Sequence, residues 1–257
     1  MHSKSRSNGR CLRTLLHTAM PTLLETAVAA HGGLDRWNHF HTVEMNASIT
    51  GGVWDAKGRM GALEEVEIKA ALNVEKVKMR FPKEGKTIFF KPDRISIETD
   101  ASSEALVVEH PRCSFDSHLE GAPWEDVHVA YFSGEALWTY LTIPFLYTYP
   151  GFEVEELGPW EEKGETWRRL KAIFPENIAS HCQEQISYFG PDGLLRRHDY
   201  TVDILGGATG ANYASNYRKV SGIVVPTSRW VFAYEGDHVV VPAPVLVAIE
   251  MGEIGFH

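Results

Sequence analysis

Apolar and polar residues alternate with a period of two over much of the chain, which is the pattern of half-buried β-strands. The clearest case is residues 43–49, where the alternation ends at a pair of glycines. A second alternating run, 66–74, changes its parity near Glu75, which indicates a turn or a bulge. Similar runs predict further strands at 77–81, 87–90, 94–99, 105–108, 166–174, 212–220, 224–234 and 245–250. The chain is therefore predicted to be mainly β, with a meander of antiparallel strands in its N-terminal half.

Two segments follow the helical period instead. Residues 21–30 predict a short helix, and residues 126–142 predict a longer one that a proline ends. The longer helix is apolar around much of its girth, so we expect it to be buried on more than one side, against the inner face of a curved sheet. Its polar exceptions, His128 and Glu135, are expected on its wetter side. Residues 145–160 are rich in aromatic residues, Pro and Gly, and are expected to form a loop long enough to act as a lid.

The segment 181–204 carries the most informative polar pattern. Its centre, Gly190-Pro191-Asp192-Gly193, is a turn sequence, because proline fixes φ at the first central position and Asp suits the second. If the two glycines pair without a bulge, His198 lies opposite Gln185 and Tyr200 lies opposite Gln183. One face of this hairpin then carries polar side chains between apolar ends, namely His181, Gln183, Gln185, His198 and Tyr200.

Two interpretations of this polar face remain open. In the first, it is the solvent face, and the opposite face with Tyr188 and Leu195 joins the core. In the second, it lines a ligand cavity, and its imidazoles, amides and phenol point at the polar end of a ligand. The second is favoured by Glu184 and Asp199, which would form a like-charge pair on the opposite face and would be unfavourable in a dry core.

Composition limits the class of protein. At 257 residues the chain can form a single domain, predicted here at 20–257, since β sandwiches and barrels reach this size. The formal net charge is −9 and no basic stripe recurs, so we expect no nucleic acid partner. The three cysteines are far apart and form no CxxC pattern, which favours a reducing compartment over a disulfide framework. No apolar run approaches the ~20 residues that span a bilayer.

The first 19 residues differ from the rest. They are basic, contain no acid, and are predicted to be a disordered extension. Arg13 and His17 interrupt the apolar stretch that a secretory signal would require. Together with the unpaired cysteines, this predicts a cytoplasmic location.

The order of elements and three motifs resemble the LolA-like proteins, the outer-membrane lipoprotein-sorting superfamily and its relatives. The resemblance covers most of residues 20–250 and implies an incomplete antiparallel β-barrel, a curved sheet wrapped on the mid-chain helix, over a hydrophobic cavity that shields acyl chains or similar ligands. This chain departs from the family in lacking a signal peptide and a lipidation cysteine, and in the polarity of the suspected cavity face. The motifs are Ala30-His31-Gly32-Gly33-Leu34 followed by Trp37, Tyr140-Leu141-Thr142-Ile143-Pro144-Phe145, and the hairpin from Phe189 to Tyr200.

The first function predicted is binding of a small hydrophobic molecule with a polar head group. Burial of apolar ligand surface would supply affinity at ~25 cal/mol per Å², and the polar side chains would orient the ligand. No cofactor is implied, and the sequence does not indicate a protein partner. The side chains expected to contact the ligand come from the hairpin and from the helix, and they are Gln183, Gln185, His128, Phe132 and Trp138.

The alternative is a cofactor-independent enzyme that acts on such a molecule in the same cavity. Histidine titrates near neutral pH, so His181 or His198 would exchange protons. Tyr200 and Gln185 would hydrogen-bond a developing oxyanion. The sequence has no GxSxG elbow, which leaves acid-base chemistry such as isomerisation, cyclisation, lyase or hydrolase action. A metal site using the two histidines and a carboxylate is a weaker interpretation, because no HxH, HExxH or CxxC spacing occurs on a matching element.

Overall fold

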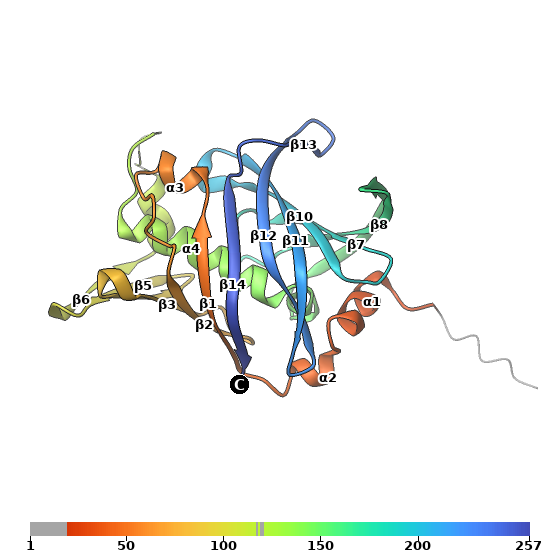
Figure 1. The fold of residues 1–257 in the computed structure, drawn as a ribbon, viewed down its shortest axis with the longest axis horizontal. Helices are drawn as coiled ribbons and strands as arrows, with labels where there is room; N and C mark the ends of the chain where they lie inside the picture. The colour runs from red at the N-terminus through yellow and green to blue at the C-terminus, as the bar shows by residue number, and fades with distance from the viewer. Residues whose placement is uncertain (1–19, 117, 119–120) are drawn as a thin grey trace, which may run out of the picture.

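The computed structural model describes residues 20–257 except 117, 119 and 120, so the extension predicted at 1–19 lies outside the described residues. The described residues form one 14-stranded antiparallel sheet (Figure 1). Its strands follow the order β6-β5-β4-β3-β2-β1-β14-β12-β11-β10-β9-β8-β7, and β13 pairs with β12 outside this path. The strands are β1 (Thr42–Thr50), β2 (Val66–Ala71), β3 (Val77–Phe81), β4 (Lys86–Lys91), β5 (Arg94–Thr99), β6 (Ser102–Glu109), β7 (Glu153–Glu162), β8 (Glu165–Ile173), β9 (Glu184–Phe189), β10 (Leu195–Val202), β11 (Ala208–Val220), β12 (Ile223–Glu235), β13 (Val239–Val241) and β14 (Val247–Phe256).

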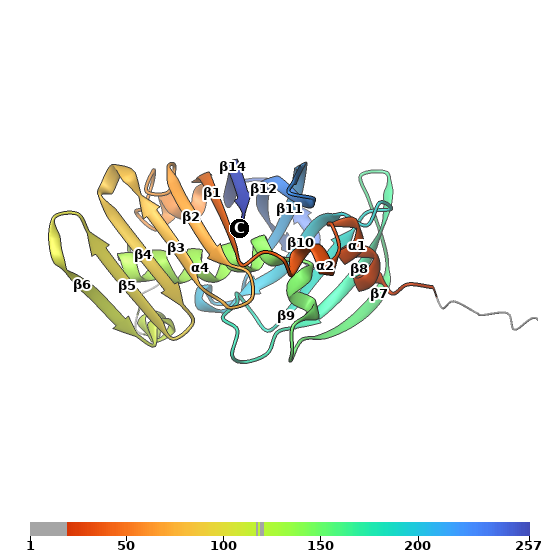
Figure 2. The ribbon, with the colours of Figure 1, turned by 90° about the horizontal axis from the view of Figure 1, so that it is seen from below.

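The sheet curves around one long helix, α4 (Asp126–Thr142), which has the bounds predicted from its periodicity. Figure 2 shows the strands arching over this helix, which lies along the concave face. Every residue from 127 to 142 is buried, as its apolar girth requires. The edge strands β6 and β7 lie at opposite ends of the strand order, so the sheet does not close into a barrel. The predicted fold class, a curved antiparallel sheet wrapped on a mid-chain helix, is confirmed.

The expectation that His128 and Glu135 lie on a wetter side of α4 is wrong, because the helix has no such side. His128 caps the helix, since its Nδ1 accepts a hydrogen bond from the backbone N–H of Glu125 at 3.0 Å. Its Nε2 lies 3.2 Å from the carbonyl oxygen of Ser114, to which it donates. Glu135 lies in the middle of the helix and is fully buried.

A glycine allows α4 to lie close to the sheet. A Cβ atom added to Gly134 would lie 2.2 Å from Cγ of Phe90 on β4, far inside van der Waals contact. Because the side chain is absent, the Phe90 ring packs directly against the helix backbone.

The shorter helices lie at the edges of this arrangement. The first, α1, begins at a capping box formed by Thr22 and Glu25. Its residues Leu23 and Ala27 pack in a smaller core with β8, while the larger core surrounds α4. The helices besides α4 are α1 (Leu23–Ala30), α2 (Leu34–Trp37), α3 (Gly52–Ala56) and the 3-10 turns η1 (Pro82–Glu84), η2 (Pro111–Phe115), η3 (Phe145–Thr148) and η4 (Asp203–Leu205).

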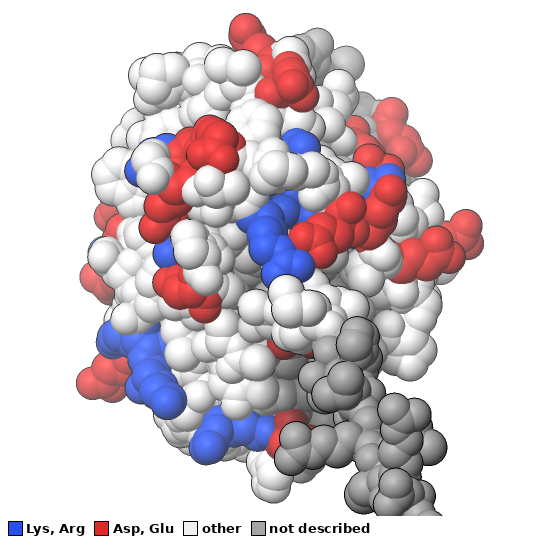
Figure 3. All heavy atoms as spheres, turned by 90° about the vertical axis from the view of Figure 1, so that its right-hand side faces the viewer, with Lys and Arg blue, Asp and Glu red and all other residues white. Residues whose placement is uncertain are grey.

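The lid-like loop predicted at 145–160 is wrong. The structure places η3 and most of the edge strand β7 in this range. Strand β7 is exposed on both faces over much of its length, so its sequence lacks the apolar alternation that identified the other strands. Figure 3 shows acidic and basic side chains close together at this end of the molecule. One ion pair between β8 and β7 joins Arg168 to Glu156 at 2.8 Å. Charged side chains on an edge strand discourage pairing with another chain.

The turn of the central hairpin is longer than predicted, and a bulge follows it. The predicted turn forms, because the backbone N–H of Gly193 donates to the carbonyl of Gly190 at 2.9 Å. The N–H of Gly190 donates to the carbonyl of Leu194, so Gly190 pairs with Leu194 and not with Gly193. The register then shifts between Leu195 and Arg197, which is a β-bulge. Side chains of both Arg196 and Arg197 consequently make their ion pairs on the outer face of the sheet.

These two changes move the pairing of β9 and β10 by two residues. His198 lies opposite Ser187, so its predicted pairing with Gln185 is wrong, as is the pairing of Tyr200 with Gln183. A shift of two residues preserves the side on which each side chain lies. His198 and Tyr200 therefore still share a face, and that face is buried against α4.

The interpretation of this face as a solvent face is thus wrong. On the opposite face, Asp199 lies across from Ile186 and not from Glu184, so the expected like-charge pair does not form. Asp199 instead accepts hydrogen bonds from Arg197 and from the hydroxyl of Tyr188 at 2.9 Å. Such pairing makes the burial of a carboxylate tolerable.

Candidate ligand-binding site

An apolar cavity of about 150 Å³ lies between α4 and one end of the sheet. Helix α3 contributes Trp54 to its wall, and α4 contributes Phe132, the one predicted ligand-contacting residue in this lining. Tyr200, predicted as catalytic, also lines it. An apolar cavity of this size can hold a molecule on the order of a benzene ring. The lining is Ile49, Val53, Trp54, Phe132, Ser133, Ala136, Leu137, Tyr140, Tyr200, Val202, Leu205, Ala208, Thr209, Gly210, Val231, Leu246, Val247 and Ile249.

A chain of buried polar groups adjoins the cavity. The hydroxyls of Tyr140 and Tyr200 lie 2.5 Å apart, and both residues belong to the cavity wall. Nε2 of His181 lies 3.4 Å from the Tyr140 hydroxyl, and its Nδ1 lies 2.9 Å from Oε1 of Glu135. The four side chains form a continuous hydrogen-bonded path from α4 to β10, at most 5% exposed.

The two tyrosines are hydrogen-bond donors at neutral pH. Burial raises the pKa of Tyr140 to about 12, although its hydrogen bond with Tyr200 acts in the opposite direction. Burial, followed by the neighbouring Tyr140, raises the pKa of Tyr200 well above its usual value. Each phenol therefore keeps one proton to donate.

Behind the tyrosines lies Arg229 of β12, which is fully buried. Its Nη2 donates to the backbone carbonyl of Tyr140 at 2.7 Å, and its Nη1 donates a long bond of 3.5 Å to Oδ1 of Asn212. The guanidinium carbon lies 5.0 Å from the centre of the Tyr140 ring, within cation–π range. Among the described residues, no carboxylate lies within the 4.0 Å that defines an ion pair with Arg229.

Three neighbouring strands place further unpartnered groups beside Arg229. His198 of β10 lies directly opposite Asn212 of β11, which adjoins β12. Both ring nitrogens of His198, Nδ2 of Asn212 and Nε of Arg229 are buried without a hydrogen-bond partner among the described residues. Burial, and then the nearby Arg229, lowers the pKa of His198 well below its usual range, so the imidazole is neutral at pH 7.

The predicted site residues fall into two groups. The structure brings His181, His198, Tyr200 and Phe132 together, since the His181 ring centre lies 5.0 Å from that of Phe132 and 4.6 Å from that of Tyr200. His198 follows at 5.3 Å from the Tyr200 ring centre. Gln185 is buried nearby, but its amide donates to the backbone of its own segment.

The remaining predicted residues lie elsewhere. His128 is engaged in capping α4, and Trp138 donates through Nε1 to the carbonyl of Ala71 at 2.8 Å. Gln183 is exposed and, like Trp138, lines a separate cleft of about 860 Å³. This cleft also contains Glu75, whose pKa burial raises well above its usual value. For the described part of the chain, no three ligating side chains are positioned to hold a metal ion.

Several residues of the polar cluster were not predicted from the sequence. The sequence predicts a solvent-exposed Glu135, and it does not assign Arg229, Asn212 or Tyr140 to the site. A signal for Arg229 exists in the alternation of β12, which puts it on the same face as Val225 and Val231. A charged residue on the core face of a strand indicates a buried polar site, because a buried charge requires partners.

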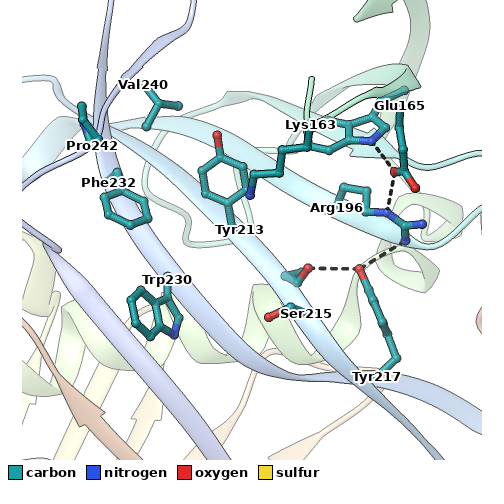
Figure 4. Close-up of a pocket in the computed structure, with 12 residues that line it drawn as sticks. Lys163, Glu165, Arg196, Tyr213, Ser215, Tyr217, Trp230, Phe232, Val240 and Pro242 are labelled. Carbon is teal, nitrogen blue, oxygen red and sulfur yellow. Dashed lines mark hydrogen bonds and ion pairs between the residues drawn. The ribbon is translucent and has the colours of Figure 1, made fainter. Parts of the chain in front are cut away.

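A further pocket of about 710 Å³ lies on the outer face of the sheet, opposite α4 (Figure 4). Tyr213, Trp230 and Phe232 form its floor on β11 and β12, and Lys163 reaches over the Tyr213 ring, with Nζ 3.8 Å from the ring centre. Arg196 closes one side through its ion pair with Glu165. None of the predicted site residues lines this pocket.

Comparison with solved structures relates the fold to LolA-like proteins. The chain is similar to a LolA superfamily protein from Nitrosomonas europaea, with 11% identity and a TM-score of 0.50, covering 91% of this chain and 92% of that one. It is similar to a putative outer membrane lipoprotein-sorting protein domain from Vibrio parahaemolyticus, with 11% identity and a TM-score of 0.52 over 91% of both chains. A DUF1329 family protein from Desulfovibrio piger gives 13% identity and a TM-score of 0.52 over 91% of both chains.

Comparison with protein-family models gives no match, and comparison with curated protein sequences gives none. The LolA-like fold inferred from the sequence motifs is nevertheless confirmed by the solved structures. The helices that the structure describes include none long and apolar enough to cross a membrane.

Proposed function

We propose that this protein binds a small hydrophobic molecule with a polar head group in the space between α4 and the concave face of the sheet. The observation that supports this most directly is the apolar cavity with the hydroxyls of Tyr140 and Tyr200 beside it. Apolar walls with a few convergent polar groups are typical of small-molecule sites. Ligand surface removed from water there would contribute ~25 cal/mol per Å².

A cytoplasmic location is part of the proposal. It is supported by the free thiols of Cys113 and Cys182, which persist in a reducing compartment. Fractionation of the producing cells tests it, and recovery of the protein outside the cytoplasm would exclude it.

The binding proposal is tested by native mass spectrometry of the protein purified from its own organism, together with solvent extraction of the denatured protein. We expect a copurifying hydrophobic molecule of defined mass. Protein that carries no such molecule, and whose thermal unfolding is unchanged by a panel of lipids and aromatic compounds, would contradict the proposal.

A pair of variants on α4 locates the binding site. Ser133 lines the cavity, and its hydroxyl is buried with no partner in the described part of the chain, so Ser133→Leu fills the space without breaking a hydrogen bond found there. We expect its affinity for the copurified molecule to fall about tenfold or more, at unchanged or higher thermal stability. Thr139→Val is the matched control, because it removes another unpartnered hydroxyl on the same helix at a position outside the cavity lining. Equal affinities of both variants would place the ligand elsewhere.

A second candidate is an acid-base enzyme acting on the same ligand, favoured by the hydrogen-bonded path from Glu135 through His181 to the two tyrosines. The carboxylate of Glu135 at Nδ1 orients the imidazole of His181 so that its Nε2 faces the tyrosine hydroxyls. The copurified molecule, incubated with the protein, would then be converted to a product that His181→Gln does not form. Binding without conversion by the native protein would leave the binding function alone.

A further inference from the structure

The polar cluster beside the cavity has more hydrogen-bond donors than acceptors. Nε of Arg229 and Nδ2 of Asn212 are N–H donors without partners among the described residues. The orientation of the Asn212 amide follows from Arg229, because a guanidinium only donates and therefore faces the oxygen. A neutral His198 adds one further N–H and one acceptor nitrogen, and Oε2 of Glu135 is the other acceptor of the cluster without a partner among the described residues. Such a set of donors is complementary to a group that only accepts.

The cluster also carries a positive charge, on Arg229, with which no carboxylate of the described residues forms an ion pair. Arg229 bonds to a carbonyl and an amide oxygen, both uncharged. The nearby carboxylate of Glu135 makes its hydrogen bond to His181 and makes none to Arg229. Burying an uncompensated cation is costly, so an anion next to Arg229 would be strongly stabilised.

The cavity and the cluster meet at the two tyrosines. Tyr140 and Tyr200 line the cavity on one side and contact Arg229 and His198 on the other. In the present arrangement, one hydroxyl donates to the other. An anionic acceptor that replaced this contact would accept a hydrogen bond from each phenol.

We propose that the head group of the bound hydrophobic molecule is a carboxylate, whose oxygens accept hydrogen bonds from Tyr140 and Tyr200 and whose charge is neutralised by Arg229. The inference rests on the proposed binding function and names its ligand class. A single guanidinium matches a monoanion, whereas a doubly charged phosphate would retain a buried negative charge. A cationic amphiphile would be repelled.

The test compares a fatty acid with its methyl ester, which has the same alkyl chain and no charge. Affinities of hexanoate and methyl hexanoate, whose short chains suit a cavity of about 150 Å³, are measured by isothermal titration calorimetry at a pH at which the acid is ionised. We expect the native protein to bind hexanoate about tenfold or more tightly than the ester, because hydrogen bonds to a charged group are the stronger ones.

Variants identify the residues responsible. In Arg229→Met the preference for the acid should disappear while the ester still binds. Tyr200→Phe keeps the ring in the cavity wall and removes one donor, so its preference for the acid over the ester should fall severalfold. If Arg229→Met does not fold, this variant alone tests the carboxylate assignment. Arg218→Met is the control. Arg218 is exposed, lies at the far end of β11, and donates to backbone carbonyls. The preference of this variant for the acid should equal that of the native protein.

The outcomes separate this inference from the function on which it rests. Equal binding of acid and ester by the native protein overturns the carboxylate assignment and leaves hydrophobic binding intact. A preference that survives in both folded variants also overturns it, because the head group would then lie elsewhere. Failure of the native protein to bind either compound, or the copurified molecule, overturns both.

Discussion

His31 illustrates how burial and two hydrogen bonds fix the state of one side chain. Its Nδ1 donates to the carbonyl of Ala27 at 2.8 Å, and its Nε2 accepts from the backbone N–H of Leu195 at 3.5 Å. A second proton on the ring would place two donors face to face. Burial lowers the pKa of His31 to about 4, although the bond to Ala27 acts in the opposite direction.

This lowered pKa predicts a loss of stability in acid. Between pH 6.5 and about 4 the unfolded chain binds a proton at His31 that the folded chain does not, so stability is complete above pH 6.5 and falls as the pH decreases. The loss over this window should be about 3 kcal/mol, from about 1.4 kcal/mol per pKa unit. Urea unfolding of the native protein and of His31→Gln from pH 7 to 4.5 gives the free energy of unfolding at each pH. Its slope against pH should be smaller in the variant. His39→Gln, at an exposed position, should keep the native slope, and a native slope in His31→Gln would contradict the prediction.

At the residue scale, the sequence predicted part of the site. His181, His198 and Tyr200 were found because alternation along a strand assigns them to one face, and that assignment survives a register error of two residues. Arg229 and Glu135 come from other elements. The sequence pattern within one element does not indicate which other element packs against it. Their role depends on the distance between α4, β10 and β12, which only the tertiary structure supplies.

At the element scale, Gly134 controls how closely α4 approaches β4. Alanine favours a helix over glycine by about 1 kcal/mol, but its Cβ would overlap the Phe90 ring. We therefore expect Gly134→Ala to destabilise the protein by about 1–3 kcal/mol in urea unfolding, the cost of overpacking a core.

Gly158→Ala provides the comparison for this prediction. The nearest atom to its added Cβ is Nη2 of Arg169 at 3.8 Å, an ordinary contact, so its effect should stay within about 0.5 kcal/mol. Equal or greater stability of Gly134→Ala would show that the helix does not lie this close to the strand.

The alternation of apolar and polar residues predicts an element where one of its faces is exposed to solvent and the other is buried. The strands at 43–49 and 94–99 have this alternation, and the apolar girth of α4 gave its bounds. The sequence predicts a loop at β7 because an edge strand that is exposed on both faces lacks the pattern. The bulge in β10 is not predicted either, since one extra residue between Leu195 and Arg197 leaves no trace in composition.

At the scale of the whole molecule, α4 connects the two halves of the sheet. It packs on β2 to β5 in the N-terminal half, and its carbonyl at Tyr140 is bound by Arg229 in the C-terminal half. A ligand that binds against α4 should therefore stabilise both halves together.

Hydrogen exchange measures this connection. At a ligand concentration one hundred times Kd, global stability should rise by about 2.7 kcal/mol. The slowest amides of β3 and of β11 should then slow by the same factor, because both exchange through global unfolding. Slowing confined to residues that line the cavity would show that the halves open independently.

The burial of α4 on every side restricts the route by which a ligand can reach the cavity. Lifting this helix from the sheet would transfer its whole apolar girth into water, including the large side chains of Tyr131 and Trp138. Exposing the short α3 segment around Trp54 and the neighbouring Leu246 transfers far less apolar surface. We therefore expect α4 to stay in place while a ligand enters. The entry route with the lower free-energy cost passes between the α3 segment around Trp54 and Leu246.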